Sequence, residues 1–160
     1  MRRVYPFLPW CRPGYAFHEA AAWVERQAAA FAGGTQFDFV VESADGRFLG
    51  ACGLNQIDTV NRRANLGYWV RSTATRRGVA TRAVRRVAEW AFANTDLNRL
   101  EIVVSTRNAA SLRVAQKAGA AREGVQRSRL VLHGKRHDAV MFALVRGPGD
   151  RRRISRGGAP

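Results

Sequence analysis

A glycine and two adjacent arginines stand where a strand-like run gives way to a helical one. The first N–H groups of a helix have no partner within it, and the helix dipole makes that end partly positive. Gly78 leaves the backbone open to a ligand, Ala80 keeps the next turn small, and guanidinium groups suit phosphate oxygens. We therefore predict that this loop binds phosphate. Its residues are Thr75, Arg76, Arg77, Gly78, Val79, Ala80 and Thr81.

The pattern of this loop leaves two interpretations open. It is neither a Walker loop, G-x-x-x-x-G-K, nor the dinucleotide motif G-x-G-x-x-G. An ordinary helix that is capped by threonine, with a glycine in its first turn and solvated arginines, fits the same residues. The neighbouring elements have to decide between the two.

Helical and strand-like segments alternate on both sides of the loop. Apolar residues recur every three or four positions in the helical segments, including Trp23, Val24 and Phe31, which we expect on the packed face of the first helix. Asn108 can cap the third helix, and Gly119 can end it. We predict helices at 18–31, 79–94 and 108–119, strands at 37–42, 47–55, 64–70 and 99–105, and a hairpin over 122–145 that turns near His133-Gly134.

This order of elements indicates the α/β class, with a mixed, mostly antiparallel central sheet flanked by helices. A chain of 160 residues fits one domain, which we place at 1–146, followed by a disordered basic tail at 147–160. The net charge is +15, and only Lys117 and Lys135 are lysines among the 27 basic residues. Such a chain attracts anions, although the coding bias of a GC-rich genome accounts for arginine-rich composition equally well.

Cysteine usage and hydropathy exclude several classes of protein. Cys11 and Cys52 lie far apart without metal-ligand spacing, so we expect no disulfide framework and no metal site. The first residues lack the apolar core of a signal peptide, and the longest apolar run, 139–145, is too short to span a bilayer. We expect a cytoplasmic protein with no membrane partner.

The ordered series of motifs around the loop resembles the GNAT superfamily of acetyl-CoA-dependent N-acyltransferases. The motifs are, in order, strand 64–70, the loop, Asn108-x-x-Ser111, Lys117-x-Gly119, Glu123-Gly124 and Arg136-x-Asp138. Within the superfamily the chain is most similar to the Rim-type branch, which acetylates the N-terminal amines of ribosomal proteins. The resemblance implies the GNAT fold, with acetyl-CoA as the co-substrate.

The resemblance also implies roles for individual residues. In the family, backbone amides of a Q/R-x-x-G-x-G/A loop bind the pyrophosphate of coenzyme A, and here Thr75-x-x-Gly78-x-Ala80 departs at the first position. A backbone N–H of Val70 or Trp69 would face the thioester. Asn108 would contact the cofactor arm, and Ser111 would act as proton donor to the sulfur. From the residues alone, the last two are a helix cap and a first-turn serine.

The general base is left unassigned. Many relatives have a glutamate on the strand that matches 64–70, but this chain has Ala64 and Asn65 there. A water-mediated base is the expectation. The remaining titratable candidates, each with a structural interpretation of its own, are Glu101, Glu123, His133 and Asp138.

Several functions stay open for the acceptor and the partners. The resemblance favours a protein or peptide N-terminal amine, and an aminoglycoside or another small amine is the same-fold alternative. A basic nucleic-acid-binding protein, or a GNAT enzyme that acts on charged tRNA, is favoured only by the charge, without an RNA-binding or helix-turn-helix motif. We expect a monomer or a homodimer.

Rim-type chains carry a strand and a helix before the segment that matches Tyr5 to Trp10. Only residues 1–4 precede that segment here. Either the start is assigned too late, or the sheet lacks its first edge strand. In the second case, the strand 37–42 would present an unpaired edge.

Overall fold

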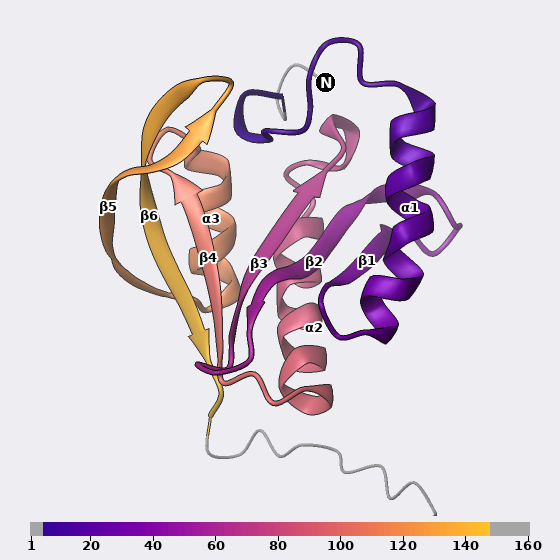
Figure 1. Ribbon diagram of the computed structural model, residues 1–160. Helices are drawn as coiled ribbons and strands as arrows, with labels where there is room; N and C mark the ends of the chain where they lie inside the picture. The colour runs from indigo at the N-terminus through magenta and orange to yellow at the C-terminus, as the bar shows by residue number, and fades with distance from the viewer. Residues whose placement is uncertain (1–4, 148–160) are drawn as a thin grey trace, which may run out of the picture.

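The computed structural model describes residues 5–147 as one sheet with three α-helices (Figure 1). The predicted order of elements and the α/β class are confirmed. The helices are α1 (Phe17–Ala32), α2 (Val79–Asn94) and α3 (Ala109–Ala118), with short 3-10 helices η1 (Tyr5–Phe7) and η2 (Ser72–Ala74). The strands are β1 (Phe37–Glu42), β2 (Phe48–Asp58), β3 (Arg63–Val70), β4 (Arg99–Ser105), β5 (Ala121–Leu132) and β6 (Lys135–Val145). The predicted basic tail, apart from Gly147, lies outside the described residues.

The sheet consists of two groups of strands that share a short seam. Its order is β1-β2-β3-β4-β6-β5, and every neighbouring pair is antiparallel except β3 and β4. These two parallel strands pair only from Arg63 with Arg99 to Asn65 with Glu101. Beyond that point they separate, as Figure 1 shows. We call the unpaired remainder of β3 and β4 the parted region; it comprises residues 66–70 and 102–105.

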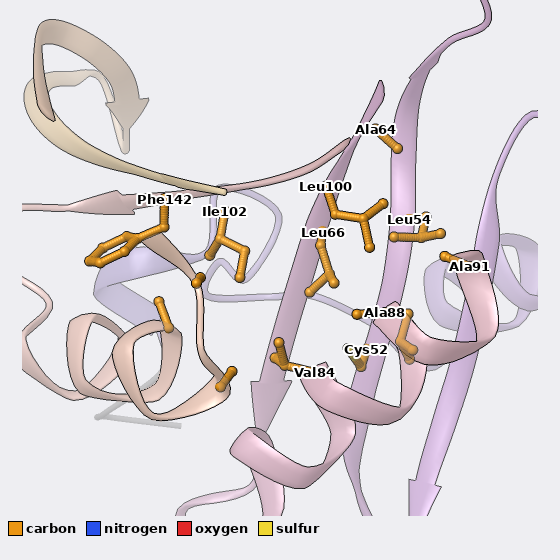
Figure 2. Packing of buried hydrophobic residues seen from close by; sticks show 14 of the residues in the cluster. Cys52, Leu54, Ala64, Leu66, Val84, Ala88, Ala91, Leu100, Ile102 and Phe142 are labelled. Atoms are coloured by element: carbon orange, nitrogen blue, oxygen red, sulfur yellow. The ribbon is translucent and has the colours of Figure 1, made fainter. Parts of the chain in front are cut away.

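The core lies between the sheet and the helices α2 and α3 (Figure 2). Side chains alternate along a strand, so every second residue of β3 and β4 points toward the helices. Helix α2 meets these residues with the stripe of small apolar side chains that its sequence predicts. The side chains that are most deeply buried include Leu54, Leu66, Val84, Leu100, Ile102 and Phe142.

Helix α1 is less buried than its sequence pattern predicts. None of its residues is buried, and Val24, expected on the packed face, is 60% exposed. Its main aromatic contact is Phe31, whose ring centroid lies 5.0 Å from that of Phe37 and 5.7 Å from that of Trp90. The expected packing through Trp23 and Val24 is therefore wrong. The reason is position: α1 stands beside β1, at the end of the sheet, so its contacts with the sheet are limited to that edge (Figure 1).

Strand β1 (Phe37–Glu42) stands at one end of the strand order in the part of the chain that the structure describes. Among residues 5–147, β2 is the strand that pairs with it. Within the same residues, no helix is long and apolar enough to cross a membrane.

Gly50 on β2 and Gly67 on β3 differ in the space around their Cβ positions, so the second is a control for the first. A Cβ on Gly50 would lie 2.1 Å from the carbonyl oxygen of Trp69, whereas a Cβ on Gly67 would meet nothing closer than the Asn65 amide nitrogen at 3.9 Å. We expect Gly50→Ala to lower the free energy of unfolding by about 1–3 kcal/mol, because the backbone must move. Gly67→Ala should change it by less than about 0.5 kcal/mol. Urea denaturation checks both values, and equal losses would contradict the prediction.

Candidate functional site

The backbone of Val70 turns its N–H group toward the parted region. Arg71 donates its N–H to β2 at 2.7 Å, and bonded and non-bonded pairs alternate along an antiparallel ladder. Val70 opposite Gly50 is therefore a non-bonded pair, and Trp69 belongs to the next bonded one. The N–H of Trp69 is thus used by β2, while that of Val70 points to the side where β4 has separated. Of the two predicted residues, the geometry brings Val70 to the parted region.

The side chain of Trp69 lies elsewhere, in a cluster of aromatic rings. Its ring centroid lies 5.7 Å from that of Trp10 and 5.6 Å from that of Phe48. Both of these neighbours are partly exposed, at 45% and 39%. The Trp69 side chain therefore contributes packing at the end of β3, and its N–H is used by β2.

Helix α2 begins at a glycine in the left-handed conformation. Gly78 is the N-cap with φ of 72°, and no side chain caps the helix. Its carbonyl accepts the N–H of Arg82 at 3.0 Å. The N–H groups of Val79, Ala80 and Thr81 are therefore the ones left without a partner inside the helix. The alternative of a threonine-capped helix is wrong, because the cap position is Gly78 itself.

The side chains of the loop surround this helix start. The Thr75 hydroxyl donates to the carbonyl oxygen of Ser72 at 2.8 Å, so it is engaged inside the loop. Arg76 and Arg77 are exposed, and Arg76 has a positive φ of 63°. Together with α2, Arg77 lines a groove of about 910 Å³ that runs to the β1–β2 hairpin. The loop therefore combines free N–H groups with exposed positive charge, as an anion site requires.

Helix α3 begins after Asn108, as predicted. The Asn108 side-chain oxygen accepts the N–H of Ser111 at 3.1 Å, which caps the helix. The Ser111 hydroxyl donates to the phenol oxygen of Tyr68 at 2.8 Å, and the Tyr68 hydroxyl donates to the Ser111 carbonyl oxygen at 3.0 Å. Tyr68 lies on β3 beyond the last residue that pairs with β4. This contact therefore joins β3 to α3, the helix that follows β4.

Sequence reasoning missed Tyr68. The available signal was strand alternation: Leu66 is a core residue, so Tyr68 faces the helices too, and a buried tyrosine hydroxyl needs a partner. Burial raises the pKa of Tyr68 to about 12, which the hydrogen bond from Ser111 opposes and the nearby Cys52 reinforces. The phenol is therefore neutral, and a hydrogen-bond donor, at physiological pH.

The two glutamates considered as a base are engaged with arginines. Glu101 pairs with Arg63 at 3.2 Å and with Arg99 at 2.8 Å. Glu123 also pairs with Arg99, and that hydrogen bond lowers the pKa of Glu123. Glu101 stands opposite Asn65, at the seam end of β3 and β4 rather than in the parted region. Both carboxylates therefore act as ion-pair partners.

The other two candidates lie near the hairpin of β5 and β6. His133 contacts the carbonyl oxygen of Tyr5 through Nε2 at 2.8 Å, and the Asp138 carboxylate accepts the N–H of Ser128 at 2.8 Å. Asp138 also borders a depression of about 410 Å³ between the end of β4 and this hairpin. The depression is mainly basic. Its lining residues are Thr106, Arg107, Lys135, Arg136, His137 and Asp138.

The fold and these contacts define an α/β protein whose central sheet parts beside a helix start that can receive phosphate. The chain belongs to the acetyltransferase (GNAT) domain family, whose model matches residues 1–121. This membership confirms the family that the sequence motifs indicate.

Individual relatives agree with this assignment. "Putative ribosomal N-acetyltransferase YdaF" of Bacillus subtilis (strain 168) is 34% identical over 64% of this chain and 56% of its own length. The N-acetyltransferase p20 of Bacillus licheniformis is 31% identical over 69% of this chain and 62% of its own. The chain thus spans less than two thirds of either relative. RimJ of Mycobacterium smegmatis, solved with CoA-disulfide, superposes with a TM-score of 0.81 at 26% identity, over 90% of this chain and 71% of RimJ.

Proposed function

We propose that this protein transfers an acetyl group from acetyl-CoA to the N-terminal amine of a protein or peptide. The observation that carries the proposal is the uncapped start of α2 at Gly78, which lies beside the parted strands β3 and β4. Family membership supports acetyl transfer. The names of YdaF, as a ribosomal N-acetyltransferase, and of RimJ, solved with a CoA derivative, support the acceptor class and the co-substrate.

The residues at the site fit a long phosphorylated thioester. The N–H groups of residues 79–81 would bind its diphosphate, as helix starts bind anions generally. Gly78 adopts the positive φ that begins α2 and carries no side chain beside these N–H groups, and the guanidinium of Arg82 lies 3.0 Å from its Cβ position. Arg76 and Arg77 would add charge from the loop. Asn108 would contact the cofactor arm, provided that its amide NH₂ group is used, since its oxygen already caps α3.

Acetyl-CoA supplies an acetyl group activated as a thioester, and its transfer forms a C–N bond, breaks a C–S bond and moves one proton from nitrogen to sulfur. The Val70 N–H would hydrogen-bond the carbonyl oxygen as negative charge grows on it. The Ser111 hydroxyl would give its proton to the sulfur and regain one from water. The amine would lose its proton to water.

An α-amine suits a site in which Glu101 and Glu123 are committed to arginines. N-terminal amines ionise at a pKa of about 7.7–8.0, whereas lysine side chains ionise near about 10.4. A substantial fraction of an N-terminal amine is therefore neutral at physiological pH without help from a strong base. An alkylamine such as a polyamine would depend on one.

The charge of the chain also favours a peptide over a cationic small amine. The net charge is +15, and Arg107, Lys135 and Arg136 line the depression beside the start of α3. Such a field attracts acidic peptide segments and repels polyamines and aminoglycosides. We infer that acidic residues shortly after the acceptor amine improve catalysis.

Calorimetric titration with acetyl-CoA, followed by an acceptor screen, tests this function. The screen compares Ser- and Ala-initiated peptides that carry acidic or basic residues after the first position, with spermidine as the cationic small amine. We expect kcat/KM for the acidic peptides to exceed that for spermidine by more than about tenfold, because opposite charge raises encounter rates. The advantage should shrink as salt is added.

The two parts of the proposal fail in different ways. Spermidine turnover equal to that of the acidic peptides would leave acetyl transfer intact but overturn the peptide acceptor. An absence of acetyl-CoA binding would overturn the enzyme itself.

A further inference from the structure

We propose that Tyr68 is a positioning residue that sets the direction of the Ser111 hydroxyl and thereby decides whether Ser111 can donate its proton into the parted region. This inference rests on the proposed function, in which Ser111 is the donor to the sulfur. It adds Tyr68, on β3, as a residue that acts through Ser111, on α3.

The contact between the two residues is close and double. The Tyr68 phenol oxygen lies 2.8 Å from Oγ of Ser111 and 3.0 Å from its carbonyl oxygen. The Ser111 N–H is held by Asn108 at 3.1 Å. The backbone of Ser111 is thus fixed on both sides of its Cα, and the hydroxyl is the part that remains able to turn.

Two arrangements of the hydroxyl hydrogens satisfy these distances, because each hydroxyl has one hydrogen and two acceptor lone pairs. In the first, Ser111 donates to Tyr68, and Tyr68 donates to the Ser111 carbonyl. In the second, Tyr68 turns its hydrogen to Oγ, which is equally within reach at 2.8 Å. Oγ then accepts from Tyr68, and its own hydrogen points away from the phenol. Only the second arrangement lets Ser111 donate to a ligand.

The surroundings of Tyr68 suit a permanent donor. Burial raises its pKa to about 12, so the phenol keeps its hydrogen at every pH at which the protein would work. The pKa of the neighbouring Cys52 thiol is also raised to about 12 by burial, so no thiolate charge competes for that hydrogen.

Loss of the phenol oxygen has a defined consequence for Ser111. A serine inside a helix readily bonds back to the carbonyl three or four residues earlier. Ser111 lies in the first turn of α3, so the carbonyl available within the helix is that of the N-cap Asn108, which already accepts the N–H of Leu112 at 3.0 Å. Without the Tyr68 oxygen, the hydroxyl should turn to the Asn108 carbonyl and away from the parted region. Tyr68→Phe removes only the oxygen and keeps the ring that packs against the core.

A double-mutant cycle with Tyr68→Phe and Ser111→Ala tests this inference. Two quantities are measured: kcat with an acceptor peptide, and the pH at which the thiol of bound CoA ionises, followed by thiolate absorbance. We expect Tyr68→Phe to lower kcat about three- to tenfold, with KM for acetyl-CoA within about twofold. The bound thiol should ionise at a pH about one unit higher, since the thiolate loses a hydrogen bond.

The Ser111→Ala background distinguishes a positioning role of Tyr68 from a general contribution to the stability of the fold. When Ser111 is already alanine, Tyr68→Phe should change kcat and thiol ionisation by less than about twofold, because both substitutions act through one hydroxyl. Tyr15→Phe, which removes a phenol oxygen beside Trp10, is the matched control and should change neither.

The outcomes distinguish this inference from the proposed function. Equal losses of kcat in both backgrounds would show that Tyr68 only holds β3 against α3, and would overturn the positioning role. Unchanged thiol ionisation in Tyr68→Phe would overturn it as well. In both cases the proposed function would stand if the wild-type protein acetylates peptides. A wild-type protein that binds no CoA overturns the function and this inference together.

Discussion

Replacing Gly78 with valine should weaken acetyl-CoA binding by about 10- to 100-fold. The φ of Gly78 is 72°, a region in which β-branched residues are strained outliers. The nearest atom to a Cβ here is Nη1 of Arg82 at 3.0 Å, the end of a flexible side chain that can move away, so the strain lies in the backbone. Relief of this strain would reorient the N–H groups that open α2. One charge-assisted hydrogen bond contributes about 1.5–3 kcal/mol, and about 1.4 kcal/mol is a factor of ten in affinity.

Titration calorimetry measures this effect, and Gly34→Val is its matched control. Gly34 has a similar φ of 67°, lies after α1, and has open space around its Cβ position. The control should lose stability through the same backbone strain but keep its affinity for acetyl-CoA. Equal weakening in both variants would point to global destabilisation. Full affinity in Gly78→Val would show that the start of α2 is not the diphosphate site.

Replacing Ser111 with alanine should lower kcat by more than about tenfold, because a positioned general acid typically contributes about 10²–10⁴-fold. The dissociation constant for acetyl-CoA should stay within about twofold. The substitution removes Oγ alone: the N–H that bonds Asn108 at 3.1 Å is retained, and alanine is a good helix former. Without a donor, the sulfur would have to leave as a free thiolate. Steady-state kinetics with a Ser- or Ala-initiated peptide, together with calorimetry, separates the two constants.

The rescue variant for this experiment is Ser111→Thr. It keeps a hydroxyl on the same carbon, so it should recover part of the lost kcat. If alanine and wild type turn over equally fast, Ser111 has no part in the reaction. If threonine is as slow as alanine, the defect arises from helix packing and not from the hydroxyl.

Elements with strong local signals could be predicted from the sequence. The predicted helix at 79–94 matches α2, and the predicted strand at 99–105 matches β4. Helix α3 was located by its flanking residues, because Asn108 caps it and Gly119 ends it with φ of 93°. Capping residues and apolar periodicity act within a few residues, so one sequence is enough to place them.

The remaining features depend on contacts between distant segments. Tyr68 and Ser111 are 43 residues apart, and their contact requires β3, β4 and α3 to be assembled first. The choice of Val70 over Trp69 depends on the register with β2, which strand composition does not fix. The exposure of α1 reflects its place beside the sheet edge, whereas its apolar periodicity is that of a packed helix.

The short seam between β3 and β4 divides the sheet into two groups of strands, β1–β3 and β4–β6. Backbone hydrogen bonds join the two groups at the pairs from Arg63 to Asn65 and at the Arg62 carbonyl oxygen, which accepts from Asn98 and Arg99. Further along, the Tyr68–Ser111 contact joins β3 to α3. A ligand that lies between the two groups of strands and contacts both would fix their relative orientation. Its binding would therefore stabilise the folded chain as a whole, and the melting temperatures of the two groups of strands would rise together.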